Sequence, residues 1–185
     1  MDRIEMFGNI AHDLTVKGEK EIELILMSSK VGLGVLVEMS EFLLKEMDDF
    51  IISKDETEDA AFIYMNNVTK MAILGMIGYK RTIGIETTLH KIANQMVDTY
   101  KRKNADYGDS FGASLDKYGP VAAHVRMSDK INRLQSLVVR KQTAQVKDES
   151  IADTFLDLAC YAIMRLVYIE MKSAEIEEEK EDADE

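Results

Sequence analysis

The sequence predicts an all-α protein folded as a compact bundle of about five helices. Apolar residues recur at the spacing of helical turns, and runs that alternate apolar and polar residues, as strands do, are few. Hydrophobic residues make up 46% and charged residues 31% of the 185 residues, with ten Gly and a single Pro. This composition is typical of globular proteins, and the length suits one compact domain better than two large ones.

The first two helices are expected at residues 19–52 and 57–79, where apolar side chains cover much of the helix circumference. Asp55 and Thr57 lie at the boundary between them, and both residue types cap helix N-termini by accepting hydrogen bonds from backbone N–H groups. A bundle of five helices can bury only part of the apolar surface of two such helices. We therefore expect the chain to form a homo-oligomer, most simply a dimer.

The remaining helices are expected at residues 85–103, 120–142 and 148–173. Gly84 fits the boundary before the first of them, since Gly is common where helices end. Pro120 fits the first turn of the next, where its missing N–H costs nothing. Between these two helices, residues 104–119 form the longest stretch predicted as irregular, and loops of that length are often functional.

The charges are distributed unevenly along three predicted parts of the chain. Residues 1–84 form an N-terminal helical segment that packs on the core, 85–173 a second helical domain, and 174–185 a tail expected to be disordered. The tail carries eight acids and one Lys, and therefore −7 of the net charge of −11. Residues 101–142 carry nine basic side chains against four Asp. A basic island in an acidic protein favours a small anionic ligand over duplex nucleic acid.

Two features predict a cytoplasmic protein without a membrane span. The apolar stretch from Ala60 to Tyr79 has Asn66, Asn67 and Lys70 at its centre, which is typical of a buried bundle helix. Cys160 is the lone cysteine and cannot form an internal disulfide, and no apolar run follows a basic region at the N-terminus.

The predicted helix 120–142 carries a basic stripe opposite its apolar face. At about 100° per residue, Met127, Ile131 and Leu134 share the side that faces the core. The stripe consists of Arg126, Asp129, Arg133 and Arg140. Each guanidinium can offer two parallel donors to phosphate oxygens, so the stripe suits a phosphate clamp. A solvated face is the alternative.

The predicted helix 148–173 begins with a row of carboxylates. Glu149, Asp153 and Asp157 follow one another at intervals of four residues and therefore share one face. Their mutual repulsion requires a partner of opposite charge. Two partners are open: the arginines Arg126 and Arg133 of the preceding helix, or Mg²⁺, which prefers a few carboxylates with water and substrate phosphates.

Three ordered motifs lie in these segments: Lys103-Asn-Ala-Asp-Tyr-Gly108, Arg126-Met-Ser-Asp-Lys-Ile-Asn-Arg-Leu134 and Asp148-Glu-Ser-Ile-Ala-Asp-Thr-Phe-Leu-Asp-Leu-Ala-Cys-Tyr161. Over about residues 85–170 the chain resembles the nucleotide modification associated domain found widely in bacteriophages. Its basic helix followed by an acid-rich helix is also similar to the MazG-like all-α nucleoside triphosphate pyrophosphohydrolases. That second pattern departs at Ser150, where a Glu would stand.

These resemblances imply a MazG-like helical architecture and a Mg²⁺-dependent enzyme of phage nucleotide metabolism in the host cytoplasm. It would hydrolyse a (deoxy)nucleoside triphosphate to monophosphate and pyrophosphate. In this hypothesis Glu149 and Asp153 are catalytic. The implied metal ligands are Asp129, Glu149, Asp153 and Asp157. The implied substrate-binding residues are Lys103, Asp106, Tyr107, Arg126, Lys130 and Arg133.

Two other classes of function stay open. A binding module would sequester a nucleotide or a nucleotide-derived signal on the same basic stripe, without turnover and without dependence on metal. A helical adaptor would need no site, only an exposed apolar stripe on the N-terminal helices. A second acidic set provides an alternative metal site in the N-terminal half: Glu38, Glu41, Glu56 and Asp59.

Overall fold

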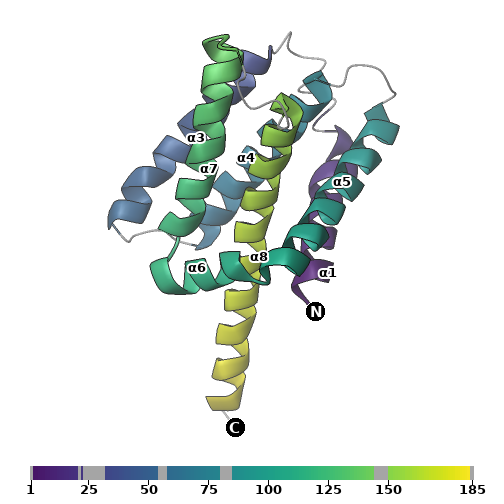
Figure 1. Ribbon diagram of the computed structural model, residues 1–185. Coiled ribbons are helices and arrows are strands. Elements are labelled where there is room, and N and C mark those ends of the chain that lie inside the picture. The colour runs from purple at the N-terminus through teal and green to yellow at the C-terminus, as the bar shows by residue number, and fades with distance from the viewer. Residues whose placement is uncertain are drawn as a thin grey trace.

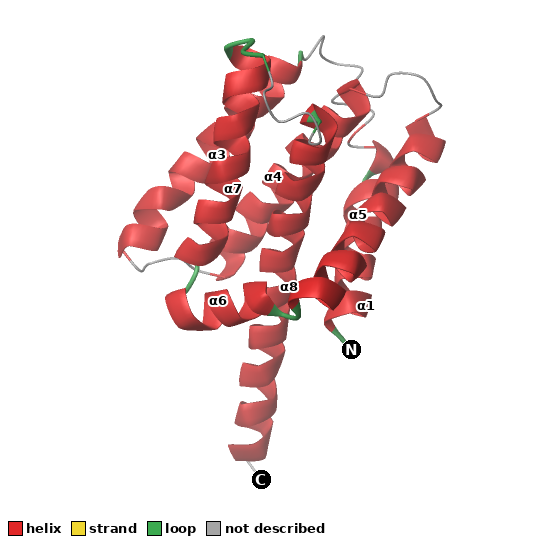
Figure 2. Cartoon of the chain, viewed as in Figure 1, coloured by secondary structure: helices red, strands yellow, loops and turns green. Residues whose placement is uncertain are grey.

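A computed structural model describes residues 2–20, 22, 32–53, 58–79, 85–143 and 150–183. Throughout these ranges the chain is helical with short connections and no strand, which confirms the predicted all-α class (Figure 2). The helices are α1 Arg3–His12, α3 Leu33–Ser53, α4 Glu58–Tyr79, α5 Ile85–Tyr107, α6 Ser110–Tyr118, α7 Val121–Leu134 and α8 Ile151–Ala183. The π-helical turns Asp13–Lys17 and Gln135–Val139 extend α1 and α7.

Helix α8 is the central element of the bundle. In Figure 1 it runs between α3, α4 and α7 on one side and α1 and α5 on the other, and it contacts α1, α4, α5 and α7. Its fully buried side chains recur at helical spacing, for example Phe155, Ala159, Ala162 and Leu166. Burial of each large apolar side chain stabilises the fold by roughly 1.5–3 kcal/mol, so α8 anchors the core.

The predicted helices at 57–79, 85–103, 120–142 and 148–173 correspond to α4, α5, α7 with its π turn, and α8. The predicted helix at 19–52 corresponds in part to α3, which begins at Leu33. Helix α1 was not predicted. It forms because Phe7 and Ala11 lie four residues apart on one face and are both buried in the bundle, where α1 packs on α5 and α8.

The prediction of an irregular stretch at 104–119 was wrong, because most of it is helical. Helix α5 continues through Tyr107, and α6 follows after a turn of two residues. Gly108 and Gly119 have φ of 60° and 70°, a left-handed conformation that ends helices and that Gly adopts without strain. Asp109 starts α6 by accepting a hydrogen bond from Gly112 N over 3.2 Å.

The acidic tail also differs from the prediction of disorder. Helix α8 extends through Ala183 and projects beyond the bundle (Figure 1), with residues 174–180 exposed. Glu, Lys and Ala have high helix propensity, and Lys172 Nζ lies 2.8 Å from Glu175 Oε2 one turn later.

In the described ranges, one helix is long and apolar enough to cross a membrane by length and composition, Asp59–Gly78 within α4. The core helix of a soluble bundle passes the same test. Helix α4 packs against α3 and α8, and Met65, Val68 and Ala72 are fully buried among them. These contacts are those of the bundle helix that the sequence predicts here.

An apolar stripe follows the outer face of α3. Val35, Met39 and Phe42 lie one to two turns apart and are exposed, Phe42 at 61%. Phe62 and Ile63 of the neighbouring α4 are also exposed. Exposed apolar clusters of this kind often mark protein interfaces. The predicted dimer therefore has a defined candidate surface.

If this stripe forms the dimer, Phe42→Glu places a charge in the interface and should yield a monomer of 21.0 kDa. Val125→Glu puts the same charge at an exposed apolar position on α7 and should leave the assembly unchanged. Light scattering coupled to size exclusion measures both. A wild-type protein that is monomeric at micromolar concentration would refute the dimer.

A close contact between α4 and α8 generates a second prediction. A Cβ atom on Gly75 would overlap the ring of Phe155, whereas one on Gly34 of α3 would meet nothing within 4 Å. Gly75→Ala should therefore destabilise the fold by roughly 1–3 kcal/mol. Gly34→Ala should be neutral or stabilise it by about 0.5–1 kcal/mol. Thermal unfolding of the two variants gives the comparison, and equal effects would show that the helices do not pack at Gly75.

Candidate functional site

A pocket of about 350 Å³ lies among α5, α7, α8 and the start of α6. Helix α5 lines it with Tyr100, Lys103, Asn104 and Tyr107, which fall on one face at intervals of three and four residues. Because α5 runs through Tyr107 without a break, this face brings a cation and two aromatic rings to one wall.

The opposite walls come from α7 and α8. Helix α8 contributes Asp157, Cys160, Tyr161 and Met164, which again share one helical face. Helix α7 contributes Arg126 and Lys130, one turn apart. With Asp109 from the turn before α6, the pocket therefore has three cationic side chains and two carboxylates next to several apolar and aromatic ones.

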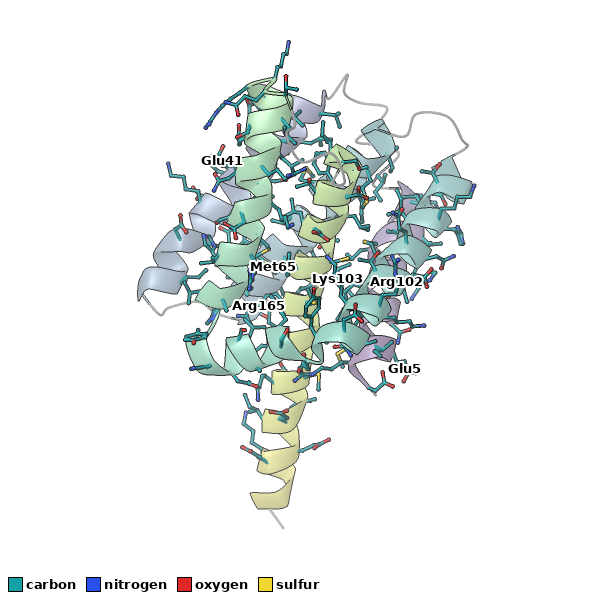
Figure 3. All side chains as sticks on the ribbon, viewed as in Figure 1. Glu5, Glu41, Met65, Arg102, Lys103 and Arg165 are labelled. Carbon is teal, nitrogen blue, oxygen red and sulfur yellow. The ribbon has the colours of Figure 1, made fainter. Side chains whose placement is uncertain are left out.

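Asp157 holds two lysines at the centre of this site. Lys103 Nζ of α5 donates to Asp157 Oδ1 over 2.6 Å, and Lys130 Nζ of α7 lies 2.8 Å from Oδ2. We call this arrangement the lysine–aspartate bridge. The Asp157 side chain is only 16% exposed, while Lys103 reaches it from the solvent side of the pocket. Figure 3 shows Lys103 beside α8, whereas Arg102, the preceding residue, lies away from it.

The bridge keeps Asp157 and Lys103 charged. Burial alone would raise the pKa of Asp157, but hydrogen bonds and charge from Lys103 and Lys130 together hold this pKa below its ordinary value of 3.8. Burial would likewise lower the pKa of Lys103, and the bond and charge of Asp157 raise it above 10.5 instead. Asp157 and Lys103 are therefore ionised at neutral pH.

Cys160 lies in the same wall but is unsuited to act as a nucleophile. Its thiol is buried, and burial together with the charge of Asp157 raises the pKa to about 12. The Sγ atom is 3.9 Å from the Met96 carbonyl oxygen. A protonated thiol is a weak nucleophile, so Cys160 contributes packing to the pocket wall.

Aromatic side chains form the apolar part of the pocket. Phe111 and Tyr161 contact each other with ring centroids 5.7 Å apart, and Tyr100 stacks on Phe7 of α1 at 4.2 Å. Tyr107 is 72% exposed at the rim, which leaves its ring accessible to a ligand. Aromatic rings that are held by contacts with other rings, next to the accessible ring of Tyr107, suit a flat ligand group.

Residues 103–169 match a protein-family model. Its description is "Nucleotide modification associated domain 1". The predicted resemblance is thereby confirmed for this segment, which is less than half of the 185 residues. No curated protein and no solved structure matches the chain, so the MazG-like resemblance gains no support.

The segment that matches the family model contains the charged side chains of the pocket. Five side chains assigned from sequence line it: Lys103, Tyr107, Arg126, Lys130 and Asp157. Asp106 is exposed at the end of α5 and does not line the pocket. Arg133 also lies elsewhere, where its Nε donates to Thr154 Oγ1 over 3.0 Å. Of the basic side chains of α7, Arg126 and Lys130 thus line the pocket, whereas Arg133 bonds to α8 outside it.

Asp153 caps the start of α8. Its Oδ2 accepts hydrogen bonds from Ser150 N at 3.0 Å and Ser150 Oγ at 2.7 Å, and its own N–H donates to Ser150 Oγ. This reciprocal pattern is a capping box. The hydrogen-bond partner of Asp153 is therefore Ser150, three residues earlier in the chain.

The predicted metal set is not assembled within the described ranges. Asp129 is exposed, both oxygens of Asp157 are bonded to lysines, and Glu149 lies outside the described residues. Among the residues that the structure describes, no three His, Cys, Asp or Glu side chains lie close enough to hold a metal ion. Mg²⁺ binding stays a prediction.

The alternative acidic set likewise forms no group of three metal-binding side chains among the residues that the structure describes. Glu41 accepts a hydrogen bond from Gln135 Nε2 over 2.5 Å, and Figure 3 shows it on the far side of the bundle from Lys103. Glu38 and Asp59 are exposed, and Glu56 lies outside the described residues.

Sequence reasoning missed the aromatic and apolar pocket residues, chiefly Tyr100, Phe111, Tyr161 and Met164. A helical wheel centred on Asp157 would have found two of them, because Tyr161 and Met164 follow it by four and seven residues. Because this helix was predicted to end at residue 103, Asn104 and Tyr107 were not placed on one helical face with Tyr100.

The bridge should make stability depend on pH in a defined way. The pKa of Asp157 in the folded protein lies below its ordinary value of 3.8. Its contribution to the free energy of unfolding is therefore fully present above pH 3.8 and is lost as the pH falls from there through the folded pKa. Asp157→Asn lacks this contribution. The difference in melting temperature between wild type and Asp157→Asn should thus be largest near pH 7 and shrink toward pH 3. A difference that is constant over this range would show that the bridge does not stabilise the fold.

Proposed function

We propose that the pocket binds a nucleoside phosphate. The observation that carries this proposal is the joining, in one cavity of about 350 Å³, of three cationic side chains with accessible and buried aromatic rings. Ligand pockets of proteins span roughly 300–1,000 Å³, with a few placed polar groups in a largely apolar lining. The description of the matching family, which associates it with nucleotide modification, is consistent with this ligand class.

The phosphate end of the ligand would bind at Lys103, Lys130 and Arg126. Lys103 and Lys130 come from two helices and meet at the lysine–aspartate bridge, and Arg126 lines the same pocket. Charge-assisted hydrogen bonds to phosphate are among the strongest in proteins, and guanidinium adds a planar fork with two donors. A carboxylate already sits between the two ammonium groups, so their spacing also suits the oxygens of a phosphate.

The base would stack on Tyr107 at the rim. Stacking of a base on an aromatic side chain contributes roughly 1–3 kcal/mol and tolerates any base, since every base has a flat face. Phe111 and Tyr161 extend the apolar surface inward from the rim.

Hydrolysis of a nucleoside triphosphate is the second candidate, and one observation favours it. Two carboxylates, Asp109 and Asp157, line the pocket beside the cations. Mg²⁺ needs only one or two carboxylates when it arrives with substrate phosphates. To bind the metal ion, Asp157 would have to release at least one of its two lysines.

Binding is tested with Lys103→Met and Lys130→Met. Each removes a donor and a positive charge from the phosphate end, and affinity for a deoxynucleoside phosphate should fall at least tenfold by calorimetry. Lys101→Met is the matched control, because Lys101 is exposed on the same helix and does not line the pocket. Equal affinities in all three variants and wild type would refute the assignment.

The same samples separate binding from hydrolysis. Incubation with deoxynucleoside and ribonucleoside triphosphates, with Mg²⁺ or with chelator, should give pyrophosphate only if the chain is an enzyme of the predicted kind. Affinity that persists in chelator without any product supports the binding function.

A further inference from the structure

The lysine–aspartate bridge occupies the place where a ligand phosphate would bind. Lys103 Nζ and Lys130 Nζ each contact a different oxygen of Asp157, at 2.6 Å and 2.8 Å. A phosphate that reaches these lysines must therefore compete with a carboxylate of the protein. The carboxylate belongs to the central helix α8, and its side chain is only 16% exposed.

We propose that Asp157 acts as an internal counterion which makes the pocket select nucleoside monophosphates over triphosphates. This inference rests on the proposed function and names the ligand class for the same site.

The balance of charge in the pocket supports this selection. Lys103, Arg126 and Lys130 supply three positive charges and Asp157 one negative charge, which leaves a net charge of +2. Asp109 also lines the pocket, but Arg3 of α1 forms an ion pair with it and cancels its charge. A 5′-monophosphate carries a charge of about −2 at neutral pH. It matches the pocket, whereas a triphosphate brings excess negative charge next to Asp157.

The size of the pocket points the same way. Its volume of about 350 Å³ is at the lower end of the usual range of roughly 300–1,000 Å³. A ligand with a single phosphate can use all three cations that line this volume, whereas two further phosphates find no additional cation among the lining residues.

Asp157 remains ionised at the pH where a nucleotide binds, since its two lysines hold its pKa below the ordinary value. A nucleotide that enters the pocket therefore meets a negative charge beside the two lysines. A repulsive element of this kind discriminates between ligands by weakening the wrong one more than the right one.

The test compares a 5′-monophosphate and a 5′-triphosphate of the same deoxynucleoside, by calorimetry in chelator, on three proteins. Wild type should bind the monophosphate more tightly. Asp157→Asn raises the pocket charge by one, so it should bind the triphosphate more tightly than wild type does and shift the ratio of affinities toward the triphosphate at least tenfold. Asp98→Asn, an exposed carboxylate on α5 that does not line the pocket, should leave the ratio unchanged.

The outcomes are distinguishable. Binding of the triphosphate to wild type as tightly as the monophosphate, or weaker binding of both by Asp157→Asn, overturns the inference and leaves the proposed nucleotide site standing. Failure of wild type to bind either nucleotide overturns both.

Should Asp157→Asn not fold, Arg126→Gln decides. Arg126 is exposed, and its loss lowers the pocket charge without breaking the bridge. The preference for the monophosphate should then widen at least threefold, and an unchanged ratio overturns the inference.

Discussion

The charge of Asp157 on the central helix is the constraint on which the rest of the site depends. It lies mostly buried, so the fold requires positive partners for it, and these come from α5 and α7. The bridge therefore fixes Lys103 and Lys130 in one place, and the pocket forms around them. The same interaction connects two outer helices to α8, so the geometry of the site and the packing of the bundle are not independent.

The short turn between α5 and α6 is the second requirement. Gly108 ends α5 in a left-handed conformation, and Asp109 starts α6 while it pairs with Arg3 of α1. This turn places Phe111 over Tyr161 and leaves Tyr107 at the rim. Helix α1 thus supports the pocket from outside the segment that matches the family model, through Arg3 and through the stack of Phe7 on Tyr100.

Much of the fold could be predicted from sequence, because long amphipathic segments such as α7 report their buried face directly through Met127, Ile131 and Leu134. The charged site residues could be predicted only as a set of residue types. A helical wheel gives the face on which Asp157 lies, but it does not give the neighbour that the face meets. Lys103 comes from a helix 54 residues away, so its pairing with Asp157 depends on tertiary packing. The turn at Gly108 was mistaken for a loop because helix-ending residues and loop residues are of the same types.

Asp153 and Asp157 show how position along a helix divides similar residues between roles. Both lie on one face of α8, yet Asp153 is in the first turn, where backbone N–H groups lack partners, and it bonds with Ser150 there. Asp157 is one turn further on, where the backbone is already paired, so its charge must be met by other helices. Of the two carboxylates, only Asp157 lines the pocket. Asp157 stabilises the bundle by binding the two lysines that the proposed site assigns to a phosphate. In that proposal the bridge would lower the affinity for every phosphate, and discrimination between ligands would arise from this competition.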